Sequence, residues 1–304
     1  MAEIISHTFL AKDVSKKLRI RNKGIIYFSL GPDPFYFSSK TFKYGNTMHR
    51  KRSLDFFTNY VKYMMDNDLC DNDDVKGCLY GFISHYVFDM YLHPYVFYKT
   101  GVFNKKRKET YKYLDGHRKM EMGITSYLAS KNKIDISKYK FYDEIFPKKR
   151  SKEIIKILDN IFYKTFYFKN GGNIYFDSLD RCKKVYKSFR YDSKGFKKVA
   201  YSVIDLFRVN KFKLKYISFY NIKETDLNKD NLKWYNPCNK KASNDSVDDI
   251  YQKSIDKTIE LICIVNDIFK GVRDIKCMKK YFGNNSYLSG IDINSDNKFK
   301  YFEN

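Results

Sequence analysis

The sequence predicts an all-α protein. Apolar residues recur three and four positions apart through most of the 304 residues, while the apolar-polar alternation that marks β-strands is rare. Glycine and proline stand between the periodic segments, where they favour turns and helix ends. Together these two patterns favour a bundle of helices over a mixed or all-β fold.

The helices can be placed in order along the chain. The first follows from Phe9, Leu10, Val14 and Leu18, which share one helical face. The same periodicity predicts further helices at about 49–66, 74–92, 105–130, 151–168, 194–208 and 245–270. Asn, Asp, Lys and Pro cluster between periodic segments and predict loops at 31–44, 132–150 and 225–244.

The chain shows no internal repeat and no sharp change of composition, so we expect one helical domain spanning residues 1–304. Within it we distinguish an N-terminal half, about 1–130, that contains every histidine, and a helical C-terminal half, about 131–283. The tail, residues 284–304, is polar, and we expect it to be partly disordered.

The chain is strongly basic. Its 58 Lys and Arg against 35 Asp and Glu give a formal charge of +23, which attracts phosphate esters, anionic lipid headgroups or nucleic acid. The abundance of Lys, Asn, Ile and Tyr is equally typical of an AT-rich coding bias. The charge is therefore only a weak indication of a polyanionic partner.

The six cysteines form no Cys-x-x-Cys pair, which argues against a cysteine zinc site and against a disulfide framework. The N-terminus lacks the basic and apolar regions of a signal peptide, and no apolar run approaches the roughly 18 residues of a membrane span. We therefore expect a cytoplasmic protein with free thiols.

All five histidines lie in the first 117 residues, which uniform placement would produce roughly once in a hundred sequences. A carboxylate follows two of them at a spacing of four: Asp89 after His85, and Glu121 after His117. On a helix this spacing sets an imidazole and a carboxylate one turn apart on one face, where both can hold the same metal ion.

His93 extends the first pair by one further turn, so that His85, Asp89 and His93 form a stripe able to reach two metal ions. We expect Pro94 to end this helix. Because the neighbouring residues are apolar, a carboxylate at position 89 costs several kcal/mol unless a cation compensates it. The alternative is a set of polar side chains with ordinary hydrogen-bond partners.

Five short motifs stand in order along the chain: SHTFLAKDV, GPDPFYF, MHR, GFISHYVFDMYLHP and GHRKMEMGITSYL. This succession resembles the signature of the zinc-dependent phospholipase C family over about residues 1–130, and in particular its intracellular branch without a signal peptide. The late segment YFGNNSYLSGI is similar to the C-terminal motif of that branch, so the resemblance covers nearly the whole chain. Single-strand-specific zinc nucleases share the same helical architecture.

The resemblance implies two or three zinc ions. The implied ligands are Asp33, His49, His85 and Asp89 for the first zinc, His93, His117 and Glu121 for the second, and His7 with a bridging Asp89 for the third. In secreted members a mature N-terminal tryptophan also holds the third zinc. This sequence begins MAEIISH, so we expect the third site to lack that ligand.

Zinc ions polarise phosphoryl oxygens and lower the pKa of a bound water towards roughly 7, so the resemblance implies hydrolysis of a phosphate ester, with phospholipid headgroups among the expected substrates. Asp33 is either the general base for the attacking water or a ligand alone. Aromatic residues near the ligands can wall a substrate site; they are Phe35, Tyr36, Tyr86 and Tyr91.

Two other functions stay open. A nuclease acting on single-stranded nucleic acid is consistent with the charge of +23. A non-catalytic, zinc-stabilised protein that binds an anionic membrane or a protein partner through its basic C-terminal half is consistent with the same charge.

Overall fold

The all-α prediction is confirmed. The computed structural model describes residues 4–135, 141–188, 192, 194–207 and 225–303. Its helices are α1 (Ile4–Lys17), α2 (Gly24–Tyr27), α3 (Phe42–Arg50), α4 (Ser53–Asp66), α5 (Asp73–Thr100), α6 (Gly116–Lys131), α7 (Phe141–Glu144), α8 (Lys152–Phe166), α9 (Gly171–Ser188), α10 (Phe196–Leu206), α11 (Val247–Phe269) and α12 (Met278–Phe282). Short 3₁₀ turns span Asp33–Phe37, Lys108–Tyr113 and Ile275–Cys277, and the strands β1 (Trp234–Tyr235) and β2 (Ala242–Ser243) pair antiparallel.

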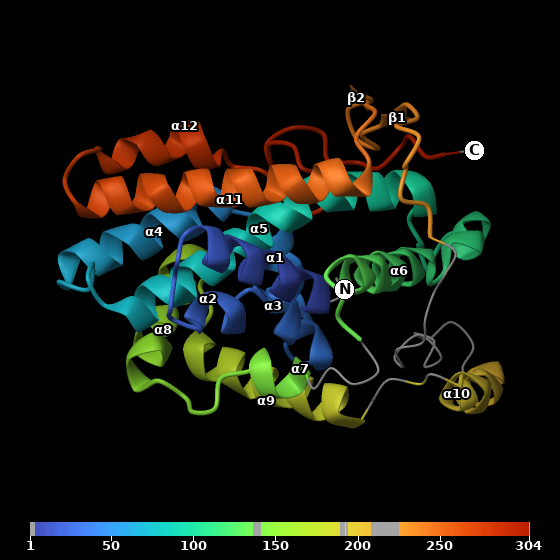
Figure 1. The fold of residues 1–304 in the computed structure, drawn as a ribbon, viewed down its shortest axis with the longest axis horizontal. Helices are drawn as coiled ribbons and strands as arrows, with labels where there is room; N and C mark the ends of the chain where they lie inside the picture. Colours follow the sequence, from blue (N-terminus) through green and yellow to red (C-terminus); the bar gives the residue numbers. More distant parts are fainter. Residues whose placement is uncertain (1–3, 136–140, 189–191, 193, 208–224, 304) are drawn as a thin grey trace.

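Helix α5 is the centre of the fold. It runs for 28 residues and is apolar around most of its circumference, as a helix covered on all sides must be. Its N-cap, Asn72, accepts hydrogen bonds from the backbone amides of Asp74 and Val75. Figure 1 shows α11 and α12 covering one side of α5, while α8 and α9 lie on the opposite side of the molecule.

Pro94 lies inside α5, so the prediction that it ends the helix is wrong. The proline ring leaves the carbonyl of Met90 without its helical donor. Gly290, at φ +67°, packs against this place: a Cβ there would stand 2.4 Å from the oxygen of Met90 and 3.1 Å from Cγ of Pro94. The close packing of Gly290, which is distant in sequence, thus stabilises α5 at a proline that would be expected to end the helix.

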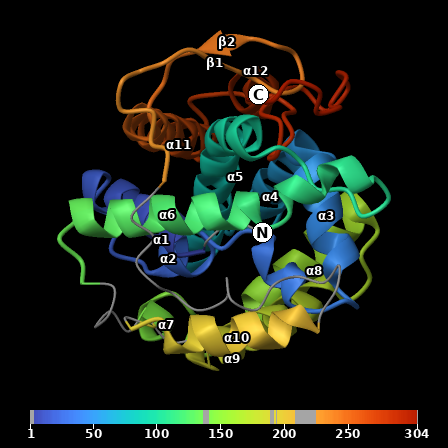
Figure 2. The same cartoon turned by 90° about the vertical axis from the view of Figure 1, so that its right-hand side faces the viewer.

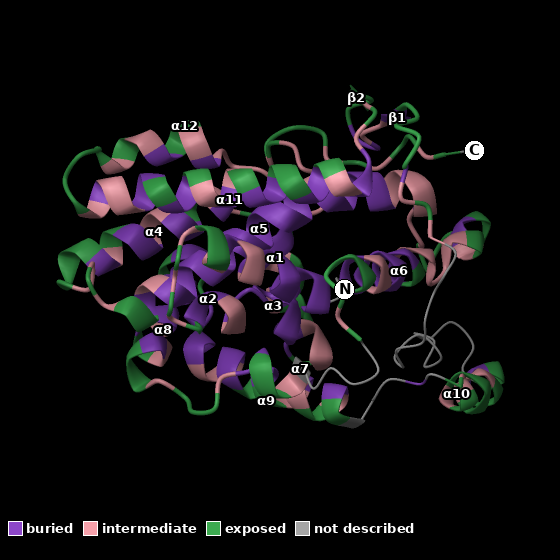
Figure 3. Cartoon of the chain, viewed as in Figure 1, coloured by how far each residue is buried: buried purple, intermediate pink, exposed green. Residues whose placement is uncertain are grey.

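The remaining helices cover α5 with their apolar faces. Helix α1 contacts α5, α6 and α11, and α6 crosses the end of the molecule that faces the viewer in Figure 2. Helices α4, α8 and α9 complete the far side of the core, where the rings of Phe56, Phe82, Phe162 and Tyr175 pack together. Figure 3 shows the buried residues concentrated on α5 and on the faces turned towards it.

Several predicted boundaries differ from the structure. The helix predicted at 49–66 is two helices, because Arg52 takes a left-handed backbone conformation, with φ 57°, between them. The helix predicted at 105–130 begins only at Gly116, after a 3₁₀ turn. Helix α9, whose apolar spacing is interrupted by polar residues, was not predicted, and the loop predicted at 31–44 contains a 3₁₀ turn and the start of α3.

The tail packs against the core where it follows α12, while the partial disorder expected for residues 284–304 stays a prediction. Tyr287 is 1% exposed, and its backbone amide donates to the carbonyl of His49 at 3.0 Å. The hydroxyl of Ser286 donates to the same carbonyl at 3.2 Å. A polar side chain such as that of Ser286 serves a buried contact here, a role that composition alone does not distinguish from disorder.

Among the described residues, no helix has the length and apolar character needed to cross a membrane.

Replacement of Tyr287 tests the structural role of the tail. Tyr287→Ala removes a buried ring that packs 4.9 Å from Tyr86, centroid to centroid, and we expect it to lower the free energy of unfolding by about 3 kcal/mol. Tyr301→Ala is the matched control, since that ring is 38% exposed and its loss should cost less than about 0.5 kcal/mol. Urea unfolding measures both; equal stabilities would contradict the packed tail.

Candidate metal centre

The stripe on α5 has the geometry that the sequence predicts. His85, Asp89 and His93 are each no more than 2% exposed and follow one another at single-turn intervals. The carboxylate of Asp89 lies 3.1 Å from Nε2 of His85 and 3.6 Å from Nδ1 of His93. Asp89 is therefore in contact with both histidines of its own helix.

A first group of side chains forms where the 3₁₀ turn and α3 meet α5. Asp33 begins the turn and His49 stands in the last turn of α3, and their donor atoms lie within 4.8 Å of those of His85. Nε2 of His49 is 3.2 Å from Oδ1 of Asp33 and 3.4 Å from Oδ2 of Asp89. The four residues predicted for the first zinc thus converge.

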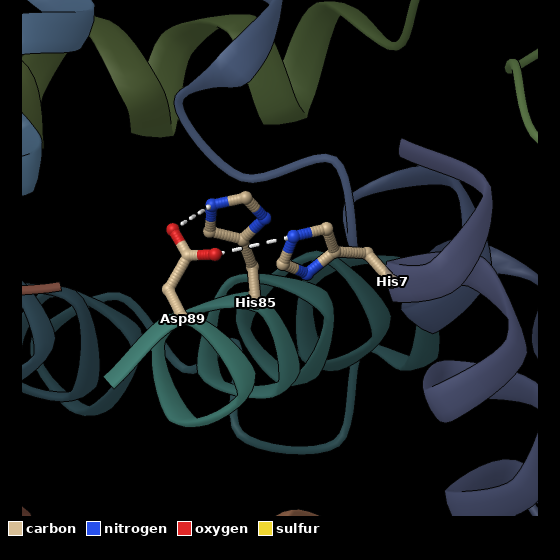
Figure 4. Close-up of side chains that lie close together, drawn as sticks. All are labelled: His7, His85 and Asp89. Carbon is tan, nitrogen blue, oxygen red and sulfur yellow. Dashed lines mark ion pairs between the residues drawn. The ribbon is translucent and has the colours of Figure 1, made fainter. Parts of the chain in front are cut away.

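A second group joins α1 to the same place. Nε2 of His7 lies 3.2 Å from Oδ1 of Asp89, and the rings of His7 and His85 stack with centroids 4.1 Å apart. Figure 4 shows the two imidazoles directed at opposite oxygens of the Asp89 carboxylate. His7 and Asp89 are the pair predicted for a third zinc; the N-terminal residues 1–3, and with them the amino group, lie outside the described residues.

A third group lies between α5 and α6. Oε1 of Glu121 is 2.8 Å from Nε2 of His117 and 3.2 Å from Nε2 of His93. These are the three residues predicted for the second zinc, and their donor atoms lie within 4.8 Å of one another. His93 also faces Asp89, so the third group is continuous with the other two.

Backbone carbonyls orient three of the histidines. Nδ1 of His85 lies 2.9 Å from the oxygen of Ser29, Nδ1 of His49 lies 2.7 Å from that of Gly45, and Nδ1 of His93 lies 2.9 Å from that of Tyr287. A hydrogen on Nδ1 leaves the lone pair of Nε2 directed into the centre, which is the arrangement that metal-binding histidines use.

The buried polar atoms that lack a hydrogen-bond partner test whether these residues suit a metal. Among the described residues, most such atoms belong to this centre: both oxygens of Asp33, Nε2 of His85, Oδ2 of Asp89, Oε2 of Glu121, and Nδ1 of His7 and His117. Some lie within 3.5 Å of a neighbour's polar atom, yet without the alignment of a hydrogen bond. Asp33, His85 and Asp89 show the geometry of ligands of a common ion, because their unpartnered atoms face one another without pairing.

The charge of the centre leads to the same conclusion. Asp33, Asp89 and Glu121 place three carboxylates at 2% exposure or less, which costs many kcal/mol without cations. Neutral imidazole and carboxylate oxygen together form the donor set that zinc takes in proteins, and no cysteine lies in any of the three groups. The residues present therefore fit zinc.

The histidines strongly favour the charged form of two carboxylates. Burial alone raises the pKa of Asp89, but His93 and His85 outweigh it and hold the pKa well below its ordinary range. Burial likewise opposes ionisation of Glu121, while His117 and His93 lower its pKa below the ordinary range. Both groups are thus carboxylates at neutral pH and available as ligands.

Of the four aromatic residues predicted to line a substrate site, only Tyr36 stays beside the centre, with its hydroxyl 3.1 Å from Nδ1 of His49. Phe35 and Tyr86 are completely buried in the core, and Tyr91 lies two residues beyond Asp89, on the opposite side of α5. The positions of these three side chains favour packing, and their contact with a substrate stays a prediction. Their high hydrophobicity serves packing.

Sequence reasoning missed Phe97 and the carbonyl of Tyr287. The ring of Phe97 contacts that of His117, with centroids 4.5 Å apart, and covers the third group. Phe97 follows His93 by four residues, and this spacing could have predicted that its ring lies on the same face of the helix as the ligands. A backbone carbonyl carries no residue signature, although Tyr287 belongs to the motif YFGNNSYLSGI that the resemblance included.

Gly31 allows a test of the centre's geometry. It has φ +49°, and a Cβ there would stand 2.3 Å from Cγ of His85. We expect Gly31→Ala to displace His85 and lower zinc affinity at least about tenfold. Gly271→Ala is the matched control: it imposes the same kind of strain at φ +71°, but no described atom lies within 4 Å. Competition with a zinc chelator measures the affinities, and equal values would contradict the assignment of His85.

Zinc binding should release a proton from His49. Burial alone lowers the pKa of this histidine, but the carboxylates of Asp33 and Asp89 outweigh burial and raise the pKa to about 9. Protonated His49 therefore stabilises the metal-free protein. Its contribution to the free energy of unfolding is fully present below about pH 6.5 and is lost as the pH rises through 9. Zinc must displace that proton, so zinc affinity should increase with pH up to about 9.

Calorimetric titration with zinc at pH 7, in two buffers of different ionisation enthalpy, counts the released protons. We expect His49→Ala to release about one proton fewer than the wild type. The same proton count in both proteins would show that His49 is not protonated in the metal-free centre.

Comparison with known proteins supports the assignment. No curated protein and no solved structure matches the chain significantly. The family model described as zinc dependent phospholipase C matches residues 2–169, a span that contains all three groups of side chains. Because this match covers more than half of the chain, the protein belongs to the zinc-dependent phospholipase C family.

Proposed function

We propose that this protein is a zinc-dependent phosphoric ester hydrolase of the phospholipase C type, which cleaves a phosphodiester. The observation that carries the proposal is the convergence of three buried carboxylates and five histidines, a group in which several buried polar atoms have no hydrogen-bond partner. Family membership adds the expectation of a zinc hydrolase. In a phospholipid, water would add to phosphorus, the bond to the glycerol oxygen would break, and the products would be diacylglycerol and a phosphorylated headgroup.

The charge of the centre suits a phosphate ester. Three carboxylates contribute −3, so two or three divalent ions leave a net positive charge that would bind an anionic phosphodiester. Bound zinc would supply Lewis acidity and a water of lowered pKa. The side chains would hold the centre in one geometry: His85, Asp89 and His93 from one rigid helix, with the others anchored on α1, α3 and α6.

Asp33 is our candidate for the proton acceptor. It is completely buried, and neither of its oxygens has a hydrogen-bond partner. One oxygen would serve as a ligand, while the other would accept the proton of the attacking water and orient it towards phosphorus. If Asp33 were a zinc ligand alone, its second oxygen would not take part in the chemical step. This difference separates the two roles.

A nuclease acting on single-stranded nucleic acid is the second candidate. The observation that favours it is the net charge of +23, which would attract a polyanion. The same centre would cleave either phosphodiester, so the difference lies in what binds around it. A comparison of substrates distinguishes the two.

Activity of zinc-loaded variants tests the proposal. We expect the wild type to hydrolyse dispersed phospholipid and bis-p-nitrophenyl phosphate, and Asp89→Ala to lose at least about a thousandfold in rate because it loses zinc. Asp13→Asn is the matched control: Asp13 accepts a hydrogen bond from the hydroxyl of Tyr251, outside the three groups, and the rate should stay unchanged.

Replacement of Asp33 tests its role as the proton acceptor. We expect zinc-loaded Asp33→Asn to have a kcat about 10²- to 10⁴-fold lower than the wild type, because the amide cannot accept the proton of the attacking water.

The outcomes separate the candidates. Faster cleavage of single-stranded DNA than of phospholipid, dependent on Asp89, would replace the phospholipase proposal with the nuclease. Equal rates for the zinc-loaded wild type and Asp89→Ala would contradict both, and would leave a zinc-stabilised protein without catalysis.

A further inference from the structure

Helix α10 is amphipathic in the reverse of the usual sense. In a helix on a protein surface the apolar face normally packs inward and the polar face meets water. In α10 the only buried residue is Asp205, which is 4% exposed. The apolar side chains point outward, so this helix does not use them for packing among the described residues.

The exposed apolar residues form one stripe. Phe196, Val199, Val203 and Leu206 follow at intervals of three and four, and their exposed fractions lie between 53% and 75%. Phe207, which follows the helix, is 84% exposed and extends the stripe. Exposed aromatic and aliphatic residues gathered on one face mark a site of interaction, whereas scattered single residues do not.

The charges around the stripe are basic. Lys194 and Lys198 are exposed and Lys197 is half-buried, while the acidic residues of the segment from 192 to 207, Asp192 and Asp205, are both buried. Asp192 accepts a hydrogen bond from the backbone amide of Lys198 at 2.9 Å, which turns its charge towards the helix end. The exposed charges of this segment are therefore positive.

We propose that α10 docks the protein on an anionic phospholipid surface. Its apolar stripe enters the boundary between headgroups and acyl chains, and its lysines contact the anionic headgroups, as in helices that lie in the plane of a membrane. A second copy of the chain is a poorer occupant, because two opposed stripes would bring their lysines together in a protein that already carries +23.

The position of α10 suits this role. In Figures 1 and 2, α10 lies at the same end of the molecule as α6, the helix that carries His117 and Glu121. A membrane in contact with α10 would thus lie on the side of the molecule where α6 exposes the metal centre's rim, since His117 is 19% exposed. Docking deepens the proposed function by bringing the enzyme to lipid, but the binding itself needs no catalysis.

Vesicle binding tests the proposal with uncharged substitutions. The double variant Val203→Ser, Leu206→Ser shortens the stripe without changing charge, and we expect its partition onto vesicles of phosphatidylcholine with about 30 mol% phosphatidylserine to fall at least about tenfold. Its matched control is Leu232→Ser, Val272→Ser, which removes the same residue types from positions that are 64% and 70% exposed elsewhere on the surface. The control should bind as the wild type does.

The dependence of binding on salt concentration separates the electrostatic contribution of the lysines from the apolar contribution of the stripe. We expect Lys194→Gln, Lys197→Gln to weaken binding at low salt and the wild type to keep a residual, salt-resistant binding that the stripe variant lacks. Equal partition of the stripe variant and its control would overturn the proposal. So would a wild-type dimer that the stripe variant dissociates without any loss of lipid binding, because the stripe would then be a contact between copies.

The same variants distinguish docking from catalysis. Hydrolysis of the soluble substrate bis-p-nitrophenyl phosphate should be equal in the wild type and the stripe variant, whereas hydrolysis of vesicle lipid should fall with binding. Loss of activity on both substrates with vesicle binding intact would contradict docking through α10, and an inactive wild type that still binds through the stripe would contradict only the proposed function.

Discussion

The carboxylate of Asp89 lies in the middle of the most completely buried helix of the protein and contacts histidines from three different helices. His7 of α1 approaches one oxygen at 3.2 Å, while His49 of α3 and His85 of α5 approach the other at 3.4 and 3.1 Å. A buried negative charge of this kind is stable only with cations close to it. The arrangement of α1 and α3 around α5 therefore depends on a group of charges, not on apolar contact alone.

The same constraint explains features remote from Asp89. Backbone carbonyls of Ser29 and Tyr287 contact the rings of His85 and His93, so the turn before Asp33 and the C-terminal tail have a fixed position relative to α5. The carbonyl of Gly45 orients His49 within α3. The tail packs where Pro94 interrupts the hydrogen bonding of α5. The hydrogen bonds between histidine rings and backbone carbonyls thus link the geometry of the metal ligands to the positions of the surrounding segments.

The helical class and the three pairs within single helices, His85 with Asp89, Asp89 with His93, and His117 with Glu121, followed from spacing, because positions i and i+4 on one helix meet regardless of the rest of the fold. The convergence of Asp33, His49 and His7 on that helix did not follow from spacing, since it depends on how separate helices pack; only the resemblance to a family indicated it. The continuation of α5 through Pro94 and the burial of Tyr287 were not predictable, because both result from contacts between residues nearly 200 positions apart in sequence. Aromatic residues such as Phe35 and Tyr86 give the same sequence signal in a core as in a binding site.

If the three groups of buried histidines and carboxylates are zinc ligands, the purified protein contains zinc. The most direct measurement is the metal content of the purified protein by mass spectrometry, with His85→Ala and His117→Ala alongside the wild type. We predict two to three zinc ions per wild-type chain and fewer in each variant. A metal-free wild-type protein that is stably folded would contradict this prediction.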